Sequence, residues 1–282
     1  MNAVLRHALL AGLLLAVCAV EPASTAPAYA GPTAPDGPTA AIVMDARTGR
    51  ILHAREAHRR WPPASTTKIL TAIIALERLP AGAVVTVSAR ASAQRQGAVI
   101  GLEAGEKWPI RDLLLAMMLR SANDAAVAVA EGAFVNTERF VEEMNARARQ
   151  LGAHESQFVN PHGFEASGHH STALDLALIA RHALRNADLA ALVRTETWDL
   201  IRPGRPPQRL VNTNQLLGRY PGADGVKTGW TAASGPSLVA SATRDGRQIL
   251  VVVLNSRNVF GDAEQLLDLG FRSVRPGALS GR

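Results

Sequence analysis

The sequence predicts an α+β fold in which strands from both ends of the chain pair in one antiparallel sheet. Strand-like runs occur within residues 39–53 and 238–254, and helical patterns dominate the chain between them. The strand–helix–strand alternation that builds parallel sheets is not found in the sequence. We therefore expect a sheet lobe made from both chain ends and a mainly helical lobe over roughly residues 70–200.

The first 30 residues have the pattern of an export signal. Arg6 precedes an apolar stretch at residues 8–20, and a Pro/Ser/Thr-rich region ends in a small-x-small sequence at residues 28–30. The apolar stretch is short for a bilayer-spanning helix, which needs about 20 residues. We expect an exported, extracytoplasmic protein of the cell wall or periplasmic space, with membrane association only through an uncleaved signal.

Composition narrows the function classes. The only cysteine, Cys18, lies in the signal, so the mature chain should contain no disulfide and no cysteine-based metal site. The net charge of +6 suits a protein that works beside a polyanion such as a cell wall. Basic and aromatic residues are not interleaved as in nucleic-acid-binding surfaces, so no nucleic-acid partner is expected.

The first predicted elements are a linker and a hairpin. Residues 31–38 are rich in Pro and Gly, which predicts a flexible linker. Residues 39–44 and 51–53 are strand-like and flank a turn at residues 45–49 that ends in a glycine. This pattern predicts two paired strands.

Helices are predicted through the middle of the chain. Prolines before Ala64 end regular structure, and the mostly apolar run at residues 67–79 predicts a buried helix with Ser65 at its N-cap. A second apolar helical pattern, residues 110–130, is interrupted by the polar segment 121–124.

The second half of the chain adds two helices, a hairpin and a closing helix. Residues 137–151 are amphipathic, and a capping-box pattern opens the helix predicted at residues 172–185. Residues 238–243 and 248–254 are strand-like and are joined by a turn, and residues 263–271 predict a short helix.

The first candidate motif is Ser65-Thr-Thr-Lys68. Residues three apart on a helix share a face, so the amine of Lys68 can approach the hydroxyl of Ser65. A serine is a weak nucleophile unless a base takes its proton, and lysine is a base only when neutral. Lowering the pKa of lysine from about 10.4 to about 7 takes roughly 4–5 kcal/mol, which burial and a second cation can supply. Taken alone, the motif also fits a capping serine followed by a solvated lysine.

The second motif, Ser121-Ala-Asn123, lies 56 residues after Ser65 and interrupts an apolar helical run. Ser121 can relay a proton to a leaving amine, and Asn123 can hold Lys68 or a substrate amide. A polar turn between helices explains this tripeptide equally well when it is considered alone.

The third motif is Lys227-Thr-Gly229, followed by Trp230 and Thr231. A glycine in a strand lets another backbone approach closely. The Lys227 cation and the hydroxyls of Thr228 and Thr231 suit a substrate carboxylate. The alternative is a hairpin edge protected by a lysine.

Together, in this order, the three motifs are the set found in penicillin-binding proteins and class A β-lactamases. Roughly residues 38–272 resemble the serine D-alanyl-D-alanine carboxypeptidase family, the low-molecular-mass penicillin-binding proteins. The resemblance also extends to the segments at residues 63–68, 160–164, 171–175, 212–214, 224–231 and 238–243.

The resemblance implies a β-lactamase/transpeptidase-like fold, with an antiparallel five-stranded sheet packed on helices beside a mainly helical lobe. Ser65 would attack the carbonyl between the two terminal D-alanines of a peptidoglycan stem peptide, with Lys68 as base and Ser121 as proton relay. Backbone N–H groups of Ser65 and Trp230 would form the oxyanion hole. Water would hydrolyse the acyl-enzyme, and β-lactam antibiotics would acylate Ser65 as covalent inhibitors. No cofactor and no metal are implied.

Two features depart from many relatives. Only 11 residues follow Phe271, so we expect a D,D-peptidase domain at residues 39–282 without a C-terminal β domain or a C-terminal membrane anchor. Trp230 follows the Lys-Thr-Gly motif where other relatives carry different residues, which bears on substrate preference.

Four other functions are weighed against a carboxypeptidase. A class A β-lactamase needs a Glu-x-x-Leu-Asn loop, and Glu165 is followed by Ala-Ser-Gly-His instead. A metal-dependent peptidase is disfavoured because the eight histidines form no His-Glu-x-x-His motif. A non-catalytic wall-binding protein would have no need of Ser65 and its lysines. A D,D-transpeptidase of the same fold, which passes the acyl group to an amine, shares every motif and stays the main alternative.

Overall fold

The structure is a computed structural model that describes residues 37–273. The predicted signal with Cys18 and residues 31–36 of the predicted linker lie outside the described residues. The predicted domain boundaries stay predictions.

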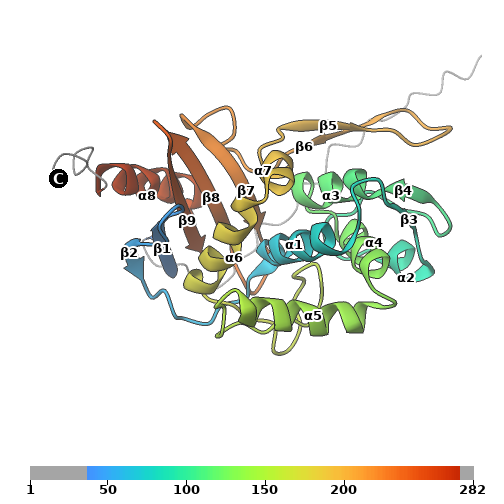
Figure 1. Ribbon diagram of the computed structural model, residues 1–282, viewed down its shortest axis with the longest axis horizontal. Helices are drawn as coiled ribbons and strands as arrows, with labels where there is room; N and C mark the ends of the chain where they lie inside the picture. Colours follow the sequence, from blue (N-terminus) through green and yellow to red (C-terminus); the bar gives the residue numbers. More distant parts are fainter. Residues whose placement is uncertain (1–36, 274–282) are drawn as a thin grey trace, which may run out of the picture. The chain divides into compact units, whose positions relative to one another are not determined.

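A five-stranded antiparallel sheet joins the two ends of the described chain, as the sequence predicts (Figure 1). The strand order is β2-β1-β9-β8-β7, so the last hairpin lies beside the first. Ala40 of β1 is paired with Leu254 of β9. The strands are β1 (Ala40–Asp45), β2 (Ile51–Arg55), β7 (Ala223–Gly229), β8 (Ser237–Arg244) and β9 (Arg247–Leu254).

Both faces of β1 and of most of β9 are buried, which explains the long apolar runs in these two strands. Side chains alternate between the two faces of a strand. Met44 and Val252 belong to the core that faces the helical part, whereas Val43 and Val251 pack in a second core with the C-terminal helix. Helix α6 (Ala173–Arg185) contacts β1, β8 and β9 on one side of the sheet, and α8 (Val259–Ser273) contacts the same strands on the other (Figure 1).

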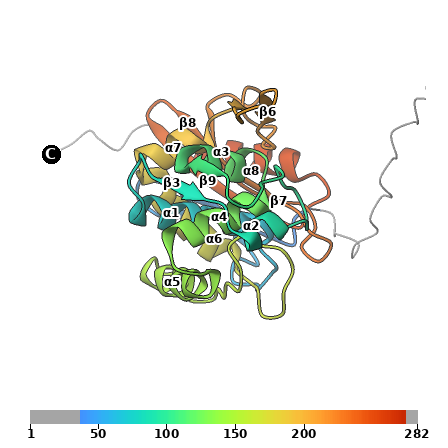
Figure 2. The same ribbon diagram turned by 90° about the vertical axis from the view of Figure 1, so that its right-hand side faces the viewer.

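The helical part is built around α1, which contacts five other α-helices and has helices above and below it in both views (Figures 1 and 2). Residues 68–75 of α1 are all buried, including Lys68. The remaining helices are η1, a 3₁₀ helix (Ala64–Thr67), α1 (Lys68–Arg78), α2 (Ala89–Ala93), α3 (Ile110–Leu119), α4 (Asn123–Ala133), α5 (Thr137–Gln150) and α7 (Ala187–Val193).

Of the two predicted helix caps, the one at Ser65 is wrong and the capping box at the start of α6 is only half formed. Ser65 is not a helix N-cap, because it lies inside η1, which continues directly into α1 and has no side-chain cap. At the start of α6, Thr172 Oγ1 accepts from the backbone N–H of Asp175 at 3.0 Å. The carboxylate of Asp175 accepts instead from Glu155 N and Ser156 Oγ, so the reciprocal half of the capping box is not made.

Four short strands were not predicted from the sequence. They form two ribbons, β3 with β4 and β5 with β6, outside the main sheet. Their ranges are β3 (Val84–Thr86), β4 (Lys107–Pro109), β5 (Thr197–Leu200) and β6 (Gln208–Val211). Within residues 37–273, no helix has the length and apolar character that crossing a membrane would require.

Candidate active site

The structure brings the three sequence motifs to one pocket of about 450 Å³. Ser65 comes from η1, Ser121 and Asn123 from the break between α3 and α4, and the third motif from the end of β7. Seven of the nine predicted site residues line the pocket: Ser65, Ser121, Asn123, Thr228, Gly229, Trp230 and Thr231. The other two, Lys68 and Lys227, are buried beside it.

The turn that carries Ser65 is held by its neighbours. Ala64 has a positive φ of 48°, a conformation that costs a non-glycine residue energy and is found where the surrounding structure imposes it. Pro63 O accepts hydrogen bonds from Thr66 N at 3.2 Å and Thr66 Oγ1 at 2.6 Å. Gly163 and Gly229 pack directly against this turn, where a Cβ atom on either would crowd Ala64.

Lys68 directs its amine at the hydroxyl of Ser65. Its Nζ lies 2.9 Å from Ser65 Oγ, 2.7 Å from Asn123 Oδ1 and 2.6 Å from the carbonyl oxygen of His162. A neutral amine has two N–H bonds and one lone pair. The amide and carbonyl oxygens can only accept, so they take both N–H bonds and leave the lone pair for the Ser65 O–H.

The surroundings of Lys68 favour this neutral form. The side chain is fully buried, and burial, followed by the positive charge of Lys227, holds the pKa of Lys68 well below its usual range. The Nδ2 of Asn123 donates to Gln96 O at 2.8 Å, which fixes the amide so that its oxygen faces Lys68.

The second lysine, Lys227, occupies a buried position on β7. Its Nζ donates to Thr228 O at 3.0 Å, and burial lowers its pKa to about 7. The hydroxyl of Thr228 is 2.6 Å from that of Thr213. This contact ties the Lys-Thr-Gly strand to the segment that follows β6.

Ser121 has the strained backbone and unsatisfied side chain that suit a functional polar group. Its φ is +62°, which is uncommon for a residue with a Cβ. Its hydroxyl oxygen is buried and has no hydrogen-bond partner within the described residues. The residue lines the pocket, so an unused hydrogen-bonding group lies in the pocket wall.

A tight turn follows β7 and shapes the pocket mouth. Thr231 Oγ1 accepts from Ser234 N at 3.1 Å, and Ser234 Oγ accepts from Thr231 N at 2.8 Å. The indole N–H of Trp61 donates to Ser234 O at 2.7 Å. Trp230, just before this turn, is 57% exposed and lines the pocket.

Sequence reasoning missed several contributors to the site. The carbonyl of His162 contacts Lys68, and Thr213 contacts Thr228, but neither residue was predicted to belong to the site. Glu165 was considered only as the missing β-lactamase glutamate, yet it lines the pocket. The sequence did contain a signal for His162 and Thr213, because residues 160–164 and 212–214 resemble the family.

The histidines near the site are engaged in structural contacts. His162 Nδ1 accepts from Phe164 N at 3.1 Å, and His169 Nδ1 accepts from Val159 N at 3.2 Å. Burial is the main cause that lowers the pKa of His162 to about 3 and that of His169 to about 4. Between Gly37 and Ser273, no group of three or more metal-ligating side chains comes together.

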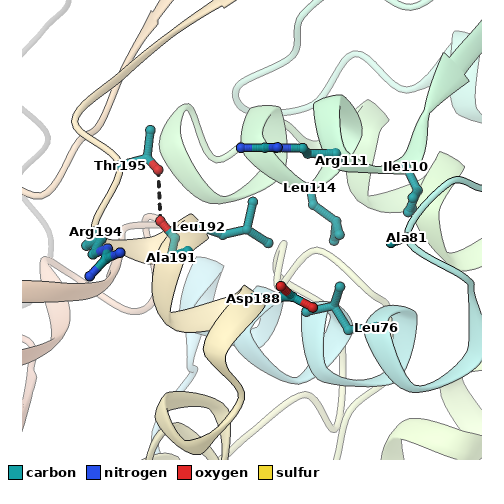
Figure 3. A pocket seen from close by; sticks show the side chains of 10 residues that line it. All are labelled: Leu76, Ala81, Ile110, Arg111, Leu114, Asp188, Ala191, Leu192, Arg194 and Thr195. Atoms are coloured by element: carbon teal, nitrogen blue, oxygen red, sulfur yellow. Dashed lines mark hydrogen bonds between the residues drawn. The ribbon is translucent and has the colours of Figure 1, made fainter.

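A larger cavity, of about 600 Å³, contains none of the predicted site residues (Figure 3). Leu76 of α1, Leu114 of α3 and Leu192 of α7 line it. Its charged lining residues, such as Arg111 and Arg194, are exposed. It brings no nucleophile next to a base, so the smaller pocket around Ser65 is the candidate active site.

The chain is similar to characterised peptidases in sequence and structure. Residues 33–258 match the peptidase S11 family, D-alanyl-D-alanine carboxypeptidase. D-alanyl-D-alanine carboxypeptidase DacB2 of Mycobacterium tuberculosis is 34% identical over 93% of this chain and 90% of that protein. DacF of Bacillus subtilis is 36% identical over 77% of this chain, but the match spans only 57% of DacF.

The chain is also similar to solved structures of such peptidases. A D-alanyl-D-alanine carboxypeptidase from Mycobacterium tuberculosis superposes with a TM-score of 0.80 at 32% identity, covering 93% of this chain and 99% of the other. The DD-transpeptidase of Streptomyces K15 superposes with a TM-score of 0.78 at 32% identity, covering 85% and 99%. The predicted fold is therefore confirmed, and the chain belongs to the D-alanyl-D-alanine carboxypeptidase family.

Proposed function

We propose that this protein is a serine-type D-Ala-D-Ala carboxypeptidase that removes the terminal D-alanine of peptidoglycan stem peptides through an acyl-enzyme. The observation that carries the proposal is the 2.9 Å approach of Lys68 Nζ to Ser65 Oγ, with both N–H bonds of a neutral amine taken by other acceptors. A base within hydrogen-bond reach of a serine is the arrangement required for nucleophilic catalysis.

In the proposed acylation, Lys68 takes the proton of Ser65 as its oxygen attacks the carbonyl between the two D-alanines. The oxyanion is bound by the backbone N–H groups of Ser65 and Trp230. The end of β7 lies against η1, since a Cβ atom on Gly229 would be 3.3 Å from Ser65 N. This proximity supports an oxyanion hole made from both segments.

The remaining roles follow from position. β7 is an edge strand of the sheet, so a peptide can add beside it through backbone hydrogen bonds. Lys227, Thr228 and Thr231 bind the terminal carboxylate of the substrate. Ser121, whose buried hydroxyl has no partner in the described part of the chain, relays the proton that Lys68 took from Ser65 to the departing D-alanine amine.

Water then releases the shortened peptide. β-Lactam antibiotics, which present a reactive carbonyl to the same serine, should acylate Ser65. The predicted export signal places this chemistry outside the cytoplasmic membrane, where peptidoglycan lies.

A D,D-transpeptidase is the second candidate, favoured by the similarity to the Streptomyces K15 enzyme. The two reactions share acylation of Ser65 and differ in whether water or an amine accepts the acyl group. Incubating the enzyme with a D-Ala-D-Ala peptide, with and without a glycine-type amine acceptor, separates them. A carboxypeptidase releases the shortened acid in both mixtures, whereas a transpeptidase forms the new amide when the acceptor is present.

Mass spectrometry after treatment with penicillin tests the nucleophile. The wild-type chain should gain one penicillin on the peptide that contains Ser65, and Ser65→Ala should gain none. Ser167→Ala, which changes an exposed serine, is the matched control and should label normally. A labelled Ser65→Ala variant would refute the assignment, and an unlabelled, inactive wild type would favour a non-catalytic binding protein.

A further inference from the structure

Glu165 is the only ionisable side chain among the residues that line the active-site pocket. Its Oε1 accepts a hydrogen bond from Ala233 N at 2.6 Å. No hydrogen bond or ion pair engages Oε2 within residues 37–273. The pocket mouth therefore carries a carboxylate with one anchored oxygen and one oxygen available to a ligand.

The backbone around Glu165 holds this carboxylate in place. Asn160 Oδ1 accepts from Gly163 N at 2.7 Å, and Asn160 Nδ2 donates to Phe164 O at 2.9 Å. These bonds fix the turn directly before Glu165, and the bond to Ala233 fixes the side chain from the opposite segment. A charged group that is already positioned loses little conformational entropy when a ligand binds.

The two ends of the pocket carry groups of opposite charge. Lys227, the cation proposed to bind the substrate carboxylate, lies buried at the serine end, whereas Glu165 is exposed. A complementary ligand has a carboxylate at one end and a cation at the other. The proposed substrate already supplies the carboxylate, as its C-terminal D-alanine.

We propose that Glu165 selects substrates with a protonated amine on the side chain of the residue that precedes the two D-alanines. This inference rests on the proposed function and names the substrate class that the same pocket prefers. The amine binds the available oxygen of Glu165, beside the exposed ring of Trp230 that lines the same pocket. Since the carboxylate is exposed to solvent, the expected preference is modest, about threefold to fivefold in kcat/KM, and it decreases as salt screens the charge.

Three synthetic peptides that end in Lys-D-Ala-D-Ala and differ only on the lysine side chain test the proposal. One has a free amine, one an acetylated amine and one a succinylated amine, which is negatively charged. For the wild type, kcat/KM should fall in that order. Glu165→Gln keeps an oxygen for Ala233 N and removes the charge, so the ratio between the free and acetylated peptides should fall to about one.

Charge reversal makes the test stricter. Glu165→Lys should prefer the succinylated peptide, which reverses the order of the wild type. Glu142→Gln is the control, because Glu142 is an exposed residue of α5 paired with Arg139 and lies outside the pocket. Its three ratios should equal those of the wild type.

The outcomes separate this inference from the proposed function. A wild type that cleaves all three peptides with the same kcat/KM contradicts only the inference. Glu165 variants that slow all three peptides equally show a structural tie to Ala233 instead of recognition, and this also overturns it. A wild type that cleaves none of the peptides overturns the proposed function, and the inference falls with it.

Discussion

Asn123 presents its amide oxygen to Lys68 at 2.7 Å, while its amide nitrogen donates to Gln96 O at 2.8 Å. The two contacts exclude the flipped amide, which would direct an N–H group at the amine. Asn123 therefore accepts a proton of Lys68 without adding a negative charge that would favour the protonated amine. This relationship links the break between α3 and α4 to the protonation state of the proposed base.

Replacing Asn123 by Asp should protonate Lys68. A carboxylate at this distance favours the charged form of a lysine, so the pKa of Lys68 should rise. Because the base must be neutral, the acid limb of the kcat/KM profile for D-alanine release should move to higher pH. Activity at pH 7 should fall.

Asn123→Ala provides the comparison. It removes an acceptor without adding charge, so it should reduce kcat/KM without moving the acid limb upward. An Asn123→Asp enzyme with the wild-type pH profile would contradict the assignment of Lys68 as the base.

Lys227 should set the alkaline limb. Its pKa is about 7 in the free protein because it is buried, and only its cation attracts the substrate carboxylate. We expect kcat/KM to decrease above about pH 7. The decrease in kcat should begin at higher pH, because a bound carboxylate stabilises the cation.

Lys227→Met tests both effects of this lysine. Losing a charged hydrogen bond to the carboxylate should lower kcat/KM by roughly tenfold to a hundredfold. Losing the neighbouring positive charge should raise the pKa of Lys68 and move the acid limb upward, since that charge contributes to its depression. If the alkaline limb persisted unchanged in this variant, another group would have to be responsible for it.

The glycine at the end of β7 should be required for activity more than for stability. A Cβ atom on Gly229 would lie 3.2 Å from the Cβ of Ala64 and 3.3 Å from Ser65 N. These distances require a displacement of only a few tenths of an ångström. Gly229→Ala should therefore cost about 1 kcal/mol or less in unfolding free energy, but lower kcat by about tenfold or more, because it shifts the N–H of Ser65, a proposed oxyanion-hole donor.

Two other glycine-to-alanine variants serve as comparisons for Gly229→Ala. Gly163 has a φ of +84°, and a Cβ atom there would overlap Ala64 O, so Gly163→Ala should cost about 2 kcal/mol or more in unfolding free energy as well as activity. Gly82 has no atom within 4 Å of such a Cβ, so Gly82→Ala should be neutral in both assays. Equal effects for all three variants would refute the geometric explanation.

The two hairpins of the main sheet were predictable because their signals are local. Residues 39–53 and 237–254 combine apolar strands with turn residues, and both pairs formed as expected. The sequence also predicted that strands from both chain ends share one sheet, and in the structure this contact is the pairing of β1 with β9. The separation of α3 from α4 followed from the polar residues at 121–124, which end one helix and begin the next.

The parts that escaped prediction depend on tertiary contacts. β5 and β6 are short and polar, and Trp198 of β5 is held by Arg111 stacked on its ring and by a 3.0 Å hydrogen bond to Asp112. The contact between Lys68 and the His162 carbonyl uses a backbone atom, which any residue would supply. The 3₁₀ turn at Ser65 requires a positive φ at Ala64, which alanine does not favour by itself.

The two buried histidines should make the fold sensitive to acid. In the folded protein the pKa values of His162 and His169 are about 3 and about 4, whereas an unfolded histidine has a pKa of about 6.5. Between pH 6.5 and 4 the unfolded chain therefore binds more protons than the folded chain, and stability must fall as the pH falls. At pH 4 the loss from each histidine should be about 3 kcal/mol relative to pH 7. Urea unfolding followed by circular dichroism at the two pH values measures it.

His169→Gln isolates one of these contributions. The variant should be less stable than the wild type at pH 7, because His169 bridges Thr67 Oγ1 and Val159 N. Its further loss of stability between pH 7 and pH 4 should nevertheless be smaller than that of the wild type by about 3 kcal/mol. His53→Gln, at an exposed position, should keep the full wild-type pH dependence. If His169→Gln also kept the wild-type pH dependence, the acid sensitivity would have to come from other groups. The buried imidazole of His169 would then make no contribution.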